Sequence, residues 1–582
     1  MPPTATAGPI PATQHAIQFV GAGRLVHDRA KPVTMPGPHQ ILARVEACGI
    51  CFSDTKLLHQ FSAHPRKSEV RGGLTADVLA EIPSYVPGEL PTVPGHETVC
   101  RIVAVGDQVR RHRIGERCLV QTDYRHLPTA LSNAAFGYDF EGGLQEYVLL
   151  DERVVIDPGS GERFLIPVGE QLSASALALV EPWACVEASY AYPERSALRW
   201  NGRLLIVADP DHEIEGLDSL VETARPTAIV TLVAVEAGQD SQRAAVEALA
   251  ALGIAVTRAS SIDDVPRESF DDVVYFGADA GRIEILQDCL APRGLINVVT
   301  GGRRFDRPVS VDVGRVHYDL TRWVGTQTGS AMNGYAVVPG DGELRPGDRM
   351  AVIGAAGPIG LMHIARAASA GLPGISIVAV DIDDARLAHL RHTVGPVARS
   401  RGVDLAVINS RTTELGGGFS YIALMVPAPP LVGQAVDLAG DGCRINIFAG
   451  FANRTRADVD LDHYIAHGCY LVGTSGSLIS DMKVVLGKLE RGELDTNISL
   501  DAVAGFAGVG DALEAVESRT ASGKIVVYPS LPELGLVGLS ELSTRFPAVA
   551  EKLVDGTWTR AAEEALLADA LPVDPREGAP SA

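Results

Sequence analysis

Two cysteines, Cys48 and Cys51, lie three positions apart in the stretch CGICFSD, residues 48–54, of a chain that has only eight cysteines. Paired thiols do redox chemistry and thiolates bind zinc, so three interpretations arise: a redox pair, half of a zinc knuckle, or one metal ligand with a chance neighbour. A knuckle requires a second close cysteine pair, which the sequence lacks. A thioredoxin-type pair belongs at a strand-to-helix turn, whereas this one ends the β-rich run ILARVEACGI. A redox pair is the default interpretation of an isolated cysteine pair in a cytosolic chain, and this position argues against it, so the residues alone leave both a redox pair and a single metal ligand open.

A glycine-rich turn, VIGAAGPIG at residues 352–360, has the pattern of a dinucleotide site. Gly354, Gly357 and Gly360 fall between a predicted strand and a predicted helix, where absent side chains let backbone amides approach a pyrophosphate. The next predicted strand ends at Asp381, twenty-one residues after Gly360 (381 − 360 = 21). A carboxylate there accepts hydrogen bonds from a ribose 2′-hydroxyl and repels a 2′-phosphate, which favours NAD over NADP.

The elements that must position these residues change in character along the chain. Up to about residue 190, short β-branched runs are separated by glycine and proline, which predicts a β-rich, barrel-like unit. From about residue 200, buried strands alternate with alanine-rich helical stretches such as residues 241–253. After a turn-rich connector over residues 337–348, the alternation starts again with five further candidate strands. The chain is therefore predicted to belong to the α/β class.

The second alternation resembles the first as an internal repeat. Residues 270–297 and 419–446 are equally spaced (297 − 270 = 446 − 419 = 27), and HYDLTRWVGTQTGS from His317 echoes HYIAHGCYLVGTSGS from His463. Where the second copy has its glycine turn, the first has IVADPDHEIEG, whose negative charges would repel a phosphate. The first copy is therefore predicted to be a scaffold that does not bind a dinucleotide in the usual way. The carboxylates concerned are Asp209, Asp211 and Glu213.

Composition excludes several classes of partner. The formal net charge of −22 would repel nucleic acid and anionic membranes, and neither is expected as a partner. The N-terminal residues lack the pattern of a signal peptide, and no stretch offers about 18 uninterrupted apolar residues. Eight scattered cysteines do not make a disulfide framework. These features predict a soluble protein located in the cytoplasm.

Several motifs together resemble the zinc-dependent medium-chain alcohol and polyol dehydrogenase family. CGICFSD, VPGHETVCRIVAVGDQV, EGGLQEYV, LALVEPWACVEA and the glycine turn occur in the family's order, and the resemblance covers residues 15–190 and 334–530. The stretches AVDIDDARL, GDGCRINIFAG and LVGTSGS resemble its sorbose-1-phosphate reductase branch, which acts on sugars and sugar phosphates. The implied fold is a GroES-like β-rich catalytic domain plus a doubly wound Rossmann domain, with a degenerate Rossmann-like repeat inserted between them. The implied boundaries are 1–195, completed by 475–530, for the zinc catalytic domain, 196–333 for the degenerate repeat, 334–474 for the NAD-binding domain and 531–582 for a helical tail.

The resemblance also implies one catalytic zinc. Cys51 and His96 match two of its ligands, and Cys48 becomes a chance neighbour. The third ligand is a choice between Glu97 and Glu181, which are expected to share the role by exchange or through water. A structural zinc is not expected, because the four-cysteine lobe of many family members is missing. An open position on the catalytic metal would admit the substrate oxygen and lower the pKa of a bound alcohol.

Further roles follow from the same resemblance. Ser53 occupies the proton-relay position, Asp54 would orient the imidazole of His96, and Lys56 would extend the relay or attract an anionic substrate. The basic run HPRKSEVRGG, residues 64–73, is a candidate contact for a phosphorylated substrate. The residues implied to bind NAD are Gly354, Gly357, Pro358, Ile359, Gly360, Asp381, Arg386, Gly450, Gly473 and Ser475.

The expected function is hydride transfer between NAD and a secondary alcohol or ketone of a polyol, sugar or sugar phosphate. The expected partners are this small molecule and further copies of the chain in a homo-oligomer. Two alternatives remain. One is a non-catalytic NAD-binding scaffold or sensor with duplicated Rossmann modules. The other is a metal-free reductase of the quinone type, because the glycine turn GAAGPIG also fits that branch.

Overall fold

The computed structural model describes residues 9–210, 212–216, 220, 230–234, 247, 249–251 and 256–570. Asp211 and most of the predicted helix over residues 241–253 lie outside these ranges. Within them, every helix is too short or too polar to cross a bilayer. Contacts divide the chain into two compact units, Met1–Cys185 with Ser477–Ala582, and Val186–Gly476.

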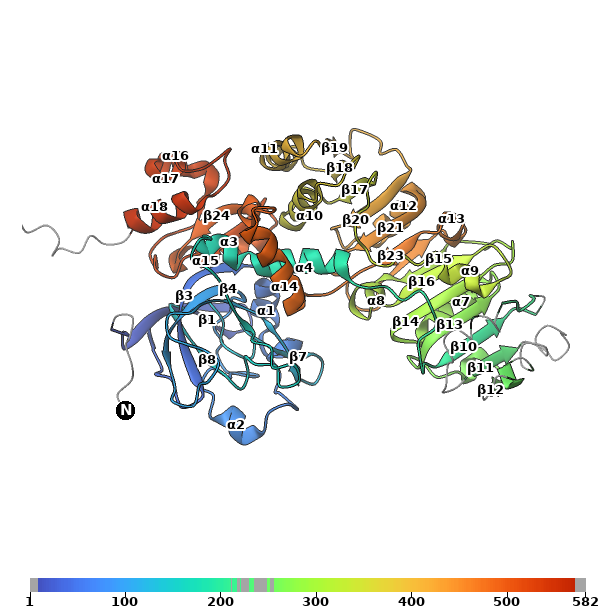
Figure 1. Cartoon of the computed structure of the whole chain (residues 1–582), viewed down its shortest axis with the longest axis horizontal. Coiled ribbons are helices and arrows are strands. Elements are labelled where there is room, and N and C mark those ends of the chain that lie inside the picture. Colours follow the sequence, from blue (N-terminus) through green and yellow to red (C-terminus); the bar gives the residue numbers. More distant parts are fainter. Residues whose placement is uncertain are drawn as a thin grey trace, which may run out of the picture. The chain divides into compact units, whose positions relative to one another are not determined.

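The first unit is built on an eight-stranded sheet that joins the two ends of the sequence (Figure 1). Most of its ladders are antiparallel, and its central strand β3 is buried along nearly its whole length. β3 lies between a strand that follows it closely in sequence and a strand from the C-terminal part of the chain. The strand order is β26 (Val537–Gly538), β24 (Leu500–Ala504), β25 (Lys524–Val527), β3 (Gln40–Ile50), β4 (Glu97–Val105), β5 (Arg117–Val120) and β9 (Leu165–Pro167), with β8 (Tyr147–Asp151) also paired to β3.

The pairing of β3 with β4 brings two of the predicted motifs together. The strands are antiparallel, and Gly49 near the end of β3 faces Glu97 at the start of β4. Helix α1 (Phe52–Gln60) begins directly after Cys51, which is its N-cap residue. The cysteine pair therefore does lie at a strand-to-helix turn, and the sequence-based argument that it only ends a strand was wrong. The stretches CGICFSD and GHE therefore meet at one end of this strand pair, although 45 residues separate Cys51 from His96 (96 − 51 = 45).

The remaining elements of this unit surround the sheet. A large hydrophobic core extends from β1 and β3 to the C-terminal β25 and α15, so the two chain segments of the unit share it. These elements are β1 (Thr13–Gly21), β2 (Arg24–Pro32), β6 (Asp123–Pro128), β7 (Asn133–Ala135), α2 (Ala76–Ala80), α3 (Ala174–Ala178), α14 (Ile479–Glu490), α15 (Val509–Glu517), α16 (Leu542–Arg545), α17 (Pro547–Ala550) and α18 (Arg560–Ala570).

The second unit contains two parallel six-stranded sheets with the same strand order (Figure 1). In each, the first strand in sequence is central, the second and third lie on one side, and the next three lie on the other. This is the order of a doubly wound dinucleotide-binding fold. The first sheet has the order β12 (Val256–Ala259), β11 (Val230–Ala234), β10 (Leu204–Ala208), β13 (Phe270–Phe276), β14 (Leu290–Val299) and β16 (Arg322–Thr326). The second has β19 (Asp404–Asn409), β18 (Ser376–Asp381), β17 (Arg349–Ile353), β20 (Phe419–Leu424), β21 (Ala439–Ile447) and β23 (Tyr470–Val472).

The central strands of both sheets are almost wholly buried, as expected where helices cover both faces of a parallel sheet. A short antiparallel pair, β15 (Val309–Asp312) with β22 (Arg456–Val459), links the two sheets. The prediction of a β-rich unit with doubly wound α/β structure is confirmed, whereas the boundaries of the four predicted segments and the insertion of the first repeat stay predictions. The described helices of this unit are α7 (Ala280–Leu286), α8 (Val313–Tyr318), α9 (Ala331–Tyr335), α10 (Pro358–Ser369), α11 (Asp384–Ser400), α12 (Pro429–Leu438) and α13 (Leu461–Ala466).

The described part of the predicted tail packs against the first unit. Glu563 on α18 is buried and its carboxylate accepts hydrogen bonds from the backbone N–H groups of Ala174 and Ser175, at the start of α3. It also accepts one from the hydroxyl of Tyr528, at 2.8 Å. A carboxylate is favoured at this position because the first N–H groups of a helix lack partners within the helix. Trp558, five residues before Glu563, is fully buried and adds apolar area to the contact between this segment and the rest of the unit.

We expect Glu563→Ala to lower the free energy of unfolding by about 2 kcal/mol, because three buried donors lose their acceptor. Urea denaturation followed by circular dichroism measures the change. Glu564→Ala is the matched control: its side chain is exposed and pairs only with Arg560 one turn away, so its effect should stay within about 0.5 kcal/mol. Equal stability of the two variants would contradict a structural role for this tail helix.

Candidate metal centre and dinucleotide site

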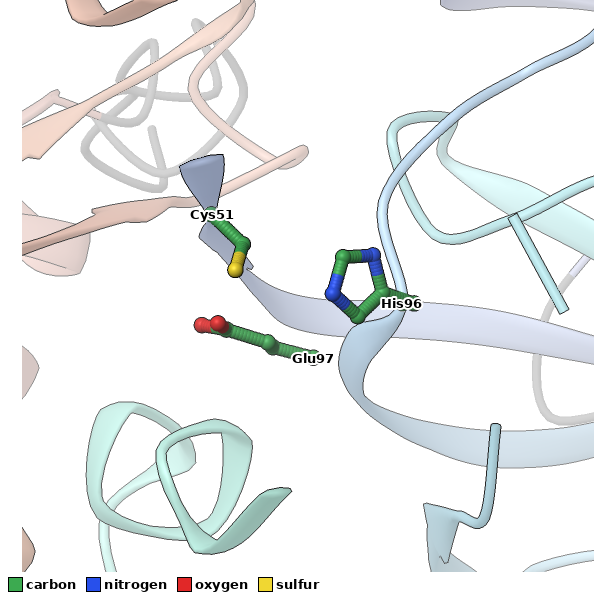
Figure 2. Close-up of side chains that lie close together, drawn as sticks. All are labelled: Cys51, His96 and Glu97. Atoms are coloured by element: carbon green, nitrogen blue, oxygen red, sulfur yellow. The ribbon is translucent and has the colours of Figure 1, made fainter. Parts of the chain in front are cut away.

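Cys51, His96 and Glu97 bring three potential metal ligands together (Figure 2). One ligand atom from each lies within 4.8 Å of the other two. No other group of three or more His, Cys, Asp or Glu residues in the described part of the chain meets this criterion. A thiolate, an imidazole and a carboxylate form a donor set that suits zinc.

The surroundings of Glu97 fit a cation. Its side chain is fully buried, Oε1 accepts a hydrogen bond from the ammonium group of Lys524, and Oε2 has no hydrogen-bond partner among the described residues. A Cβ atom at Gly49 would lie 1.9 Å from this Oε2, so only glycine leaves room for the carboxylate. A buried carboxylate oxygen without a partner is costly, and a metal ion at the ligand cluster would compensate it.

Asp54 holds both of the other ligands. Its Oδ2 accepts a hydrogen bond of 2.9 Å from the backbone N–H of Cys51, and its Oδ1 lies 3.3 Å from Nδ1 of His96. Nε2 of His96 lies 3.1 Å from the hydroxyl of Ser53. Asp54 therefore lies beside the imidazole and Ser53 beside the ligand cluster, while the roles of both residues stay predictions. Lys56 lies on the exposed side of α1, with its ammonium group 5.6 Å from the centre of the Phe52 ring.

Glu181 lies outside the three-residue cluster. It is in the first turn of α4 (Val180–Ala191), and its Oε1 accepts a 3.8 Å hydrogen bond from the thiol of Cys185. Burial raises the pKa of its carboxyl group to about 7, an effect that His96 opposes and Glu97 reinforces. Of the two carboxylates that the sequence left as alternatives, Glu97 is the one that the structure places with Cys51 and His96.

Cys48 lies in the hydrophobic core rather than in the cluster. It is fully buried, and a Cβ at Gly95 would come within 2.6 Å of its sulfur. Burial raises the pKa of this thiol to about 12, so a thiolate is strongly disfavoured there. All eight cysteines are free thiols, and the spatial arrangement agrees with one ligand and one core neighbour.

Tyr138, near the cluster, was not predicted from the sequence, and it contacts two residues of the basic run. The ring of Tyr138 lies 5.7 Å from that of His96 and 5.0 Å from that of His64, and the guanidinium of Arg66 lies 5.6 Å from its centre. No local pattern distinguishes Tyr138 in the stretch FGYDF. The cations of the basic run largely serve the fold, because Arg66 pairs with Asp123 and the buried Lys67 donates to backbone carbonyls.

The glycine turn has a steric reason for two of its three glycines, Gly354 and Gly360. Gly354, directly after β17, has φ of +84°, and a Cβ at Gly360 would lie 2.5 Å from the carbonyl oxygen of Ala355. Gly357 is the N-cap residue of α10, with Pro358 in the first helical position. The turn therefore leads to a helix N-terminus with free backbone N–H groups, as a pyrophosphate requires.

The other residues predicted to bind NAD lie on the same sheet. Asp381 ends β18, and its carboxylate accepts hydrogen bonds from the backbone N–H groups of Ala356 and Ile382 at 2.9 and 2.7 Å. A guanidinium nitrogen of Arg386 lies 3.4 Å from where a Cβ of Gly357 would be, so both side chains border the turn. Ile359 is half-buried in the first turn of α10, Gly450 follows β21, and Gly473 and Ser475 follow β23.

The described residues that follow β10 in the first sheet form no such turn. Asp209 follows β10 as Gly354 follows β17, and its carboxylate accepts hydrogen bonds from the hydroxyl of Tyr275 and the guanidinium of Arg282. The negative charge that was predicted to repel phosphate is thus paired within the fold. Glu213 is exposed, and Asp211 lies outside the described residues.

Comparisons with known proteins agree with this arrangement. Residues 37–158 match the family model of the alcohol dehydrogenase GroES-like domain. The uncharacterised protein YggP of Escherichia coli is 30% identical over 247 residues, which make up 39% of this chain and 57% of that protein. Mannitol-1-phosphate 5-dehydrogenase of Aliivibrio fischeri is 25% identical over 248 residues, 38% of this chain and 57% of that enzyme. L-sorbose 1-phosphate reductase of Klebsiella pneumoniae is 26% identical over 241 residues, 39% and 56% of the two chains. The chain thus spans little more than half the length of these relatives.

Proposed function

We propose, from the premise that this chain belongs to the medium-chain alcohol and polyol dehydrogenase family, that it is a zinc-dependent oxidoreductase. In this proposal it transfers hydride between NAD and a secondary alcohol or ketone. The observation that carries the proposal is the ligand cluster of Cys51, His96 and Glu97, in which a buried carboxylate oxygen has no hydrogen-bond partner among the described residues.

The residues would divide the work as follows. Cys51, His96 and Glu97 hold the metal, and Glu181 is the alternative to Glu97 as third ligand. When bound, zinc supplies a Lewis acid for the substrate oxygen, and NAD supplies the hydride acceptor. Asp54 keeps the His96 ring and the Cys51 backbone in place through its two carboxylate oxygens. Ser53 offers a hydroxyl at the cluster through which a proton can leave the alcohol.

The proposed cofactor is NAD. Gly354, Gly357 and Gly360 leave the pyrophosphate free access to the N-terminus of α10. Asp381, beside that turn, is placed to accept hydrogen bonds from the ribose hydroxyls and to repel a 2′-phosphate. Arg386 would add a positive charge at the same turn.

The proposed substrates are polyols, sugars or sugar phosphates. Two relatives are named for reactions of phosphorylated sugars or polyols, which supports this class for the present chain. The cytoplasmic location and the homo-oligomeric assembly stay predictions from the sequence.

The test is metal analysis of purified, tag-free protein combined with an assay for NADH formation. We expect one zinc per chain, activity that is lost on chelation and returns with zinc, and a preference for NAD over NADP. NAD binding without zinc and without hydride exchange would instead favour a scaffold or sensor. Turnover by zinc-free protein would favour the metal-free quinone-type reductase. Either result would overturn the proposal.

A further inference from the structure

The strand pair β15–β22 links the two parallel sheets. Its register is the one expected if a local twofold axis related the two sheets. The two copies can be aligned from equivalent features: Asp312 caps α8 as Asp460 caps α13, and WVGT at residues 323–326 matches LVGT at 471–474. Both features are 148 residues apart (460 − 312 = 471 − 323 = 148). The HY dipeptides at residues 317 and 463 differ by only 146 and therefore occupy different helix positions, so that part of the sequence echo is coincidental.

With this alignment, the strand register is reciprocal. Ser310 faces Asp458, which is its own equivalent in the other copy (310 + 148 = 458). Val309 faces Val459, the equivalent of Val311, and Val311 in turn faces Ala457, the equivalent of Val309. In an interface with twofold symmetry, residue i contacts residue j of the other copy and j contacts i. The pair β15–β22 meets this condition at three of its four register positions, the exception being Asp312, which faces Arg456 at the end of the pair.

A second contact, outside the strand pair, is reciprocal as well. A Cβ at Gly325 would lie 2.7 Å from Cγ1 of Ile465, and a Cβ at Gly473 would lie 3.1 Å from Cα of His317. Gly325 and Gly473 are equivalent, and so are His317 and Ile465 (317 + 148 = 465). Each glycine therefore makes room for the fifth residue of a helix in the other copy: Gly325 for Ile465 of α13, and Gly473 for His317 of α8.

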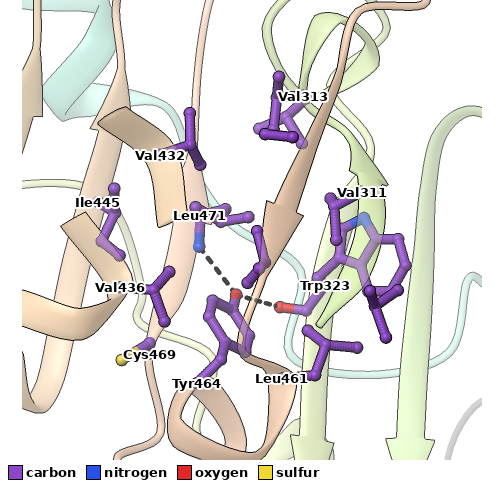
Figure 3. Close-up of a cluster of buried hydrophobic side chains, with 14 of the residues drawn as sticks. Val311, Val313, Trp323, Val432, Val436, Ile445, Leu461, Tyr464, Cys469 and Leu471 are labelled. Carbon is purple, nitrogen blue, oxygen red and sulfur yellow. Dashed lines mark hydrogen bonds between the residues drawn. The ribbon is translucent and has the colours of Figure 1, made fainter. Parts of the chain in front are cut away.

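The two copies share one apolar core across this axis (Figure 3). Val311, Val313 and Trp323 of the first copy pack with Leu461, Tyr464 and Leu471 of the second in a single cluster of buried residues. The hydroxyl of Tyr464 donates a 2.8 Å hydrogen bond to the carbonyl oxygen of Trp323 and accepts one of 2.9 Å from the backbone N–H of Leu471. Such continuous burial resembles an obligate interface between subunits, although both sides belong to one chain.

We infer that residues 204–326 are a built-in second copy, which occupies the twofold surface of the NAD-binding repeat within the same chain. This twofold surface consists of β22, α13 and β23, and the partner that it fits is another copy of the same fold. Because it is filled within the chain, it is closed to a second chain. A homo-oligomer would have to use other surfaces. The inference concerns assembly alone and does not depend on the proposed reaction.

The position on the axis provides a test. Directly opposed residues of an antiparallel pair have Cα atoms about 4.5–5.5 Å apart, which is within the range of a disulfide. Ser310 is half-buried and Asp458 is exposed, and neither is one of the proposed metal ligands or part of the glycine turn. The full chain carrying Ser310→Cys and Asp458→Cys is oxidised at low protein concentration. We expect a disulfide within one chain, seen as monomeric mass on a non-reducing gel and as a linked peptide by mass spectrometry.

Two matched variants complete the experiment. Ser310→Cys with Arg456→Cys joins diagonal neighbours, about 7–8 Å apart, and should cross-link far less. Asp458→Cys alone should form no disulfide dimer. If two chains paired through this surface, residue 458 would face its own copy and a single cysteine would link them.

Three results would overturn the inference. Disulfide dimers of the Ser310→Cys, Asp458→Cys chain would show that the copies exchange between chains. Dimers of the single variant would show that the twofold surface is open. Absence of any disulfide between residues 310 and 458 would show that the two strands do not pair.

Discussion

Cys51→Ser is expected to lower kcat/KM by about 10³-fold or more and to remove the metal. A serine hydroxyl stays protonated near neutral pH and is a poor zinc ligand, so the cluster loses one of its three charged or strongly donating groups. This factor corresponds to a loss of about 4 kcal/mol in the stabilisation of the transition state by the metal. Zinc content by elemental analysis and initial rates with NAD measure the two effects in parallel.

Cys48→Ser is the control for this prediction. Cys48 lies three residues away but is fully buried in the core, so a hydroxyl there should cost stability, about 1–3 kcal/mol, and leave zinc content unchanged. The reverse pattern, with metal lost from Cys48→Ser and kept by Cys51→Ser, would exchange the roles of the two cysteines. Circular dichroism of both variants separates loss of metal from loss of fold.

Lys524→Met should lower the free energy of unfolding of the metal-free protein by about 3–5 kcal/mol, because it leaves the buried carboxylate of Glu97 without its cation. Burial alone would lower the pKa of Lys524, but Glu97, Cys51 and Glu181 together outweigh it and the net shift is upward, as expected for a lysine that stays charged in an ion pair. Urea denaturation at pH 7, after removal of metal with a chelator, measures the loss. With zinc bound the loss should be smaller, since the ion would share the charge of Glu97.

Two further variants test this explanation. The double variant Lys524→Met, Glu97→Gln removes both charges and should recover most of the stability that the single variant loses. Lys56→Met removes a lysine from the exposed side of α1 and should change stability by no more than about 0.5 kcal/mol. A double variant as unstable as Lys524→Met would mean that lost packing of the lysine stem, rather than an unpaired charge, explains the effect.

Features that depend on short stretches could be predicted from the sequence. The turn after β17 needs glycine because of its own φ angle and its own backbone contacts, so the pattern at Gly354 and Gly360 is visible locally. The same holds for Cys51 and Asp54, which are joined by one turn at the start of α1.

Contacts made across the sheet could not be predicted in this way. Lys524 meets Glu97, 427 residues away, because β25 pairs with β3 and β3 pairs with β4. In the sequence, Lys524 is simply a lysine before the apolar run IVV. A lysine at the end of a strand usually lies in solvent, so nothing in this stretch indicates a buried ion pair. Tyr138 reaches His96 through the folding of a loop that has no periodic pattern. The choice between Glu97 and Glu181 depended on such distances and stayed open for the same reason.

The echo between the two HY dipeptides shows the limit of matching letters. The helices α8 and α13 are aligned by their aspartate caps, and this alignment places Ile465, rather than His463, at the position of His317. Identity of two residues could not reveal that the dipeptide lies two positions nearer the cap in α13 than in α8.

The twofold contact within one chain also changes what mutation can do to it. In a homodimer, each substitution is introduced twice, once on either side of the axis, and both copies of a binding site change together. Here each position varies alone. His317 and Ile465 have already diverged at equivalent places, and Asp209 stands in one half where Gly354 stands in the other. One half could therefore lose its glycine turn while the other kept its own. A single gene thereby evolves as the two unlike subunits of a heterodimer do, without the need to express them in equal amounts.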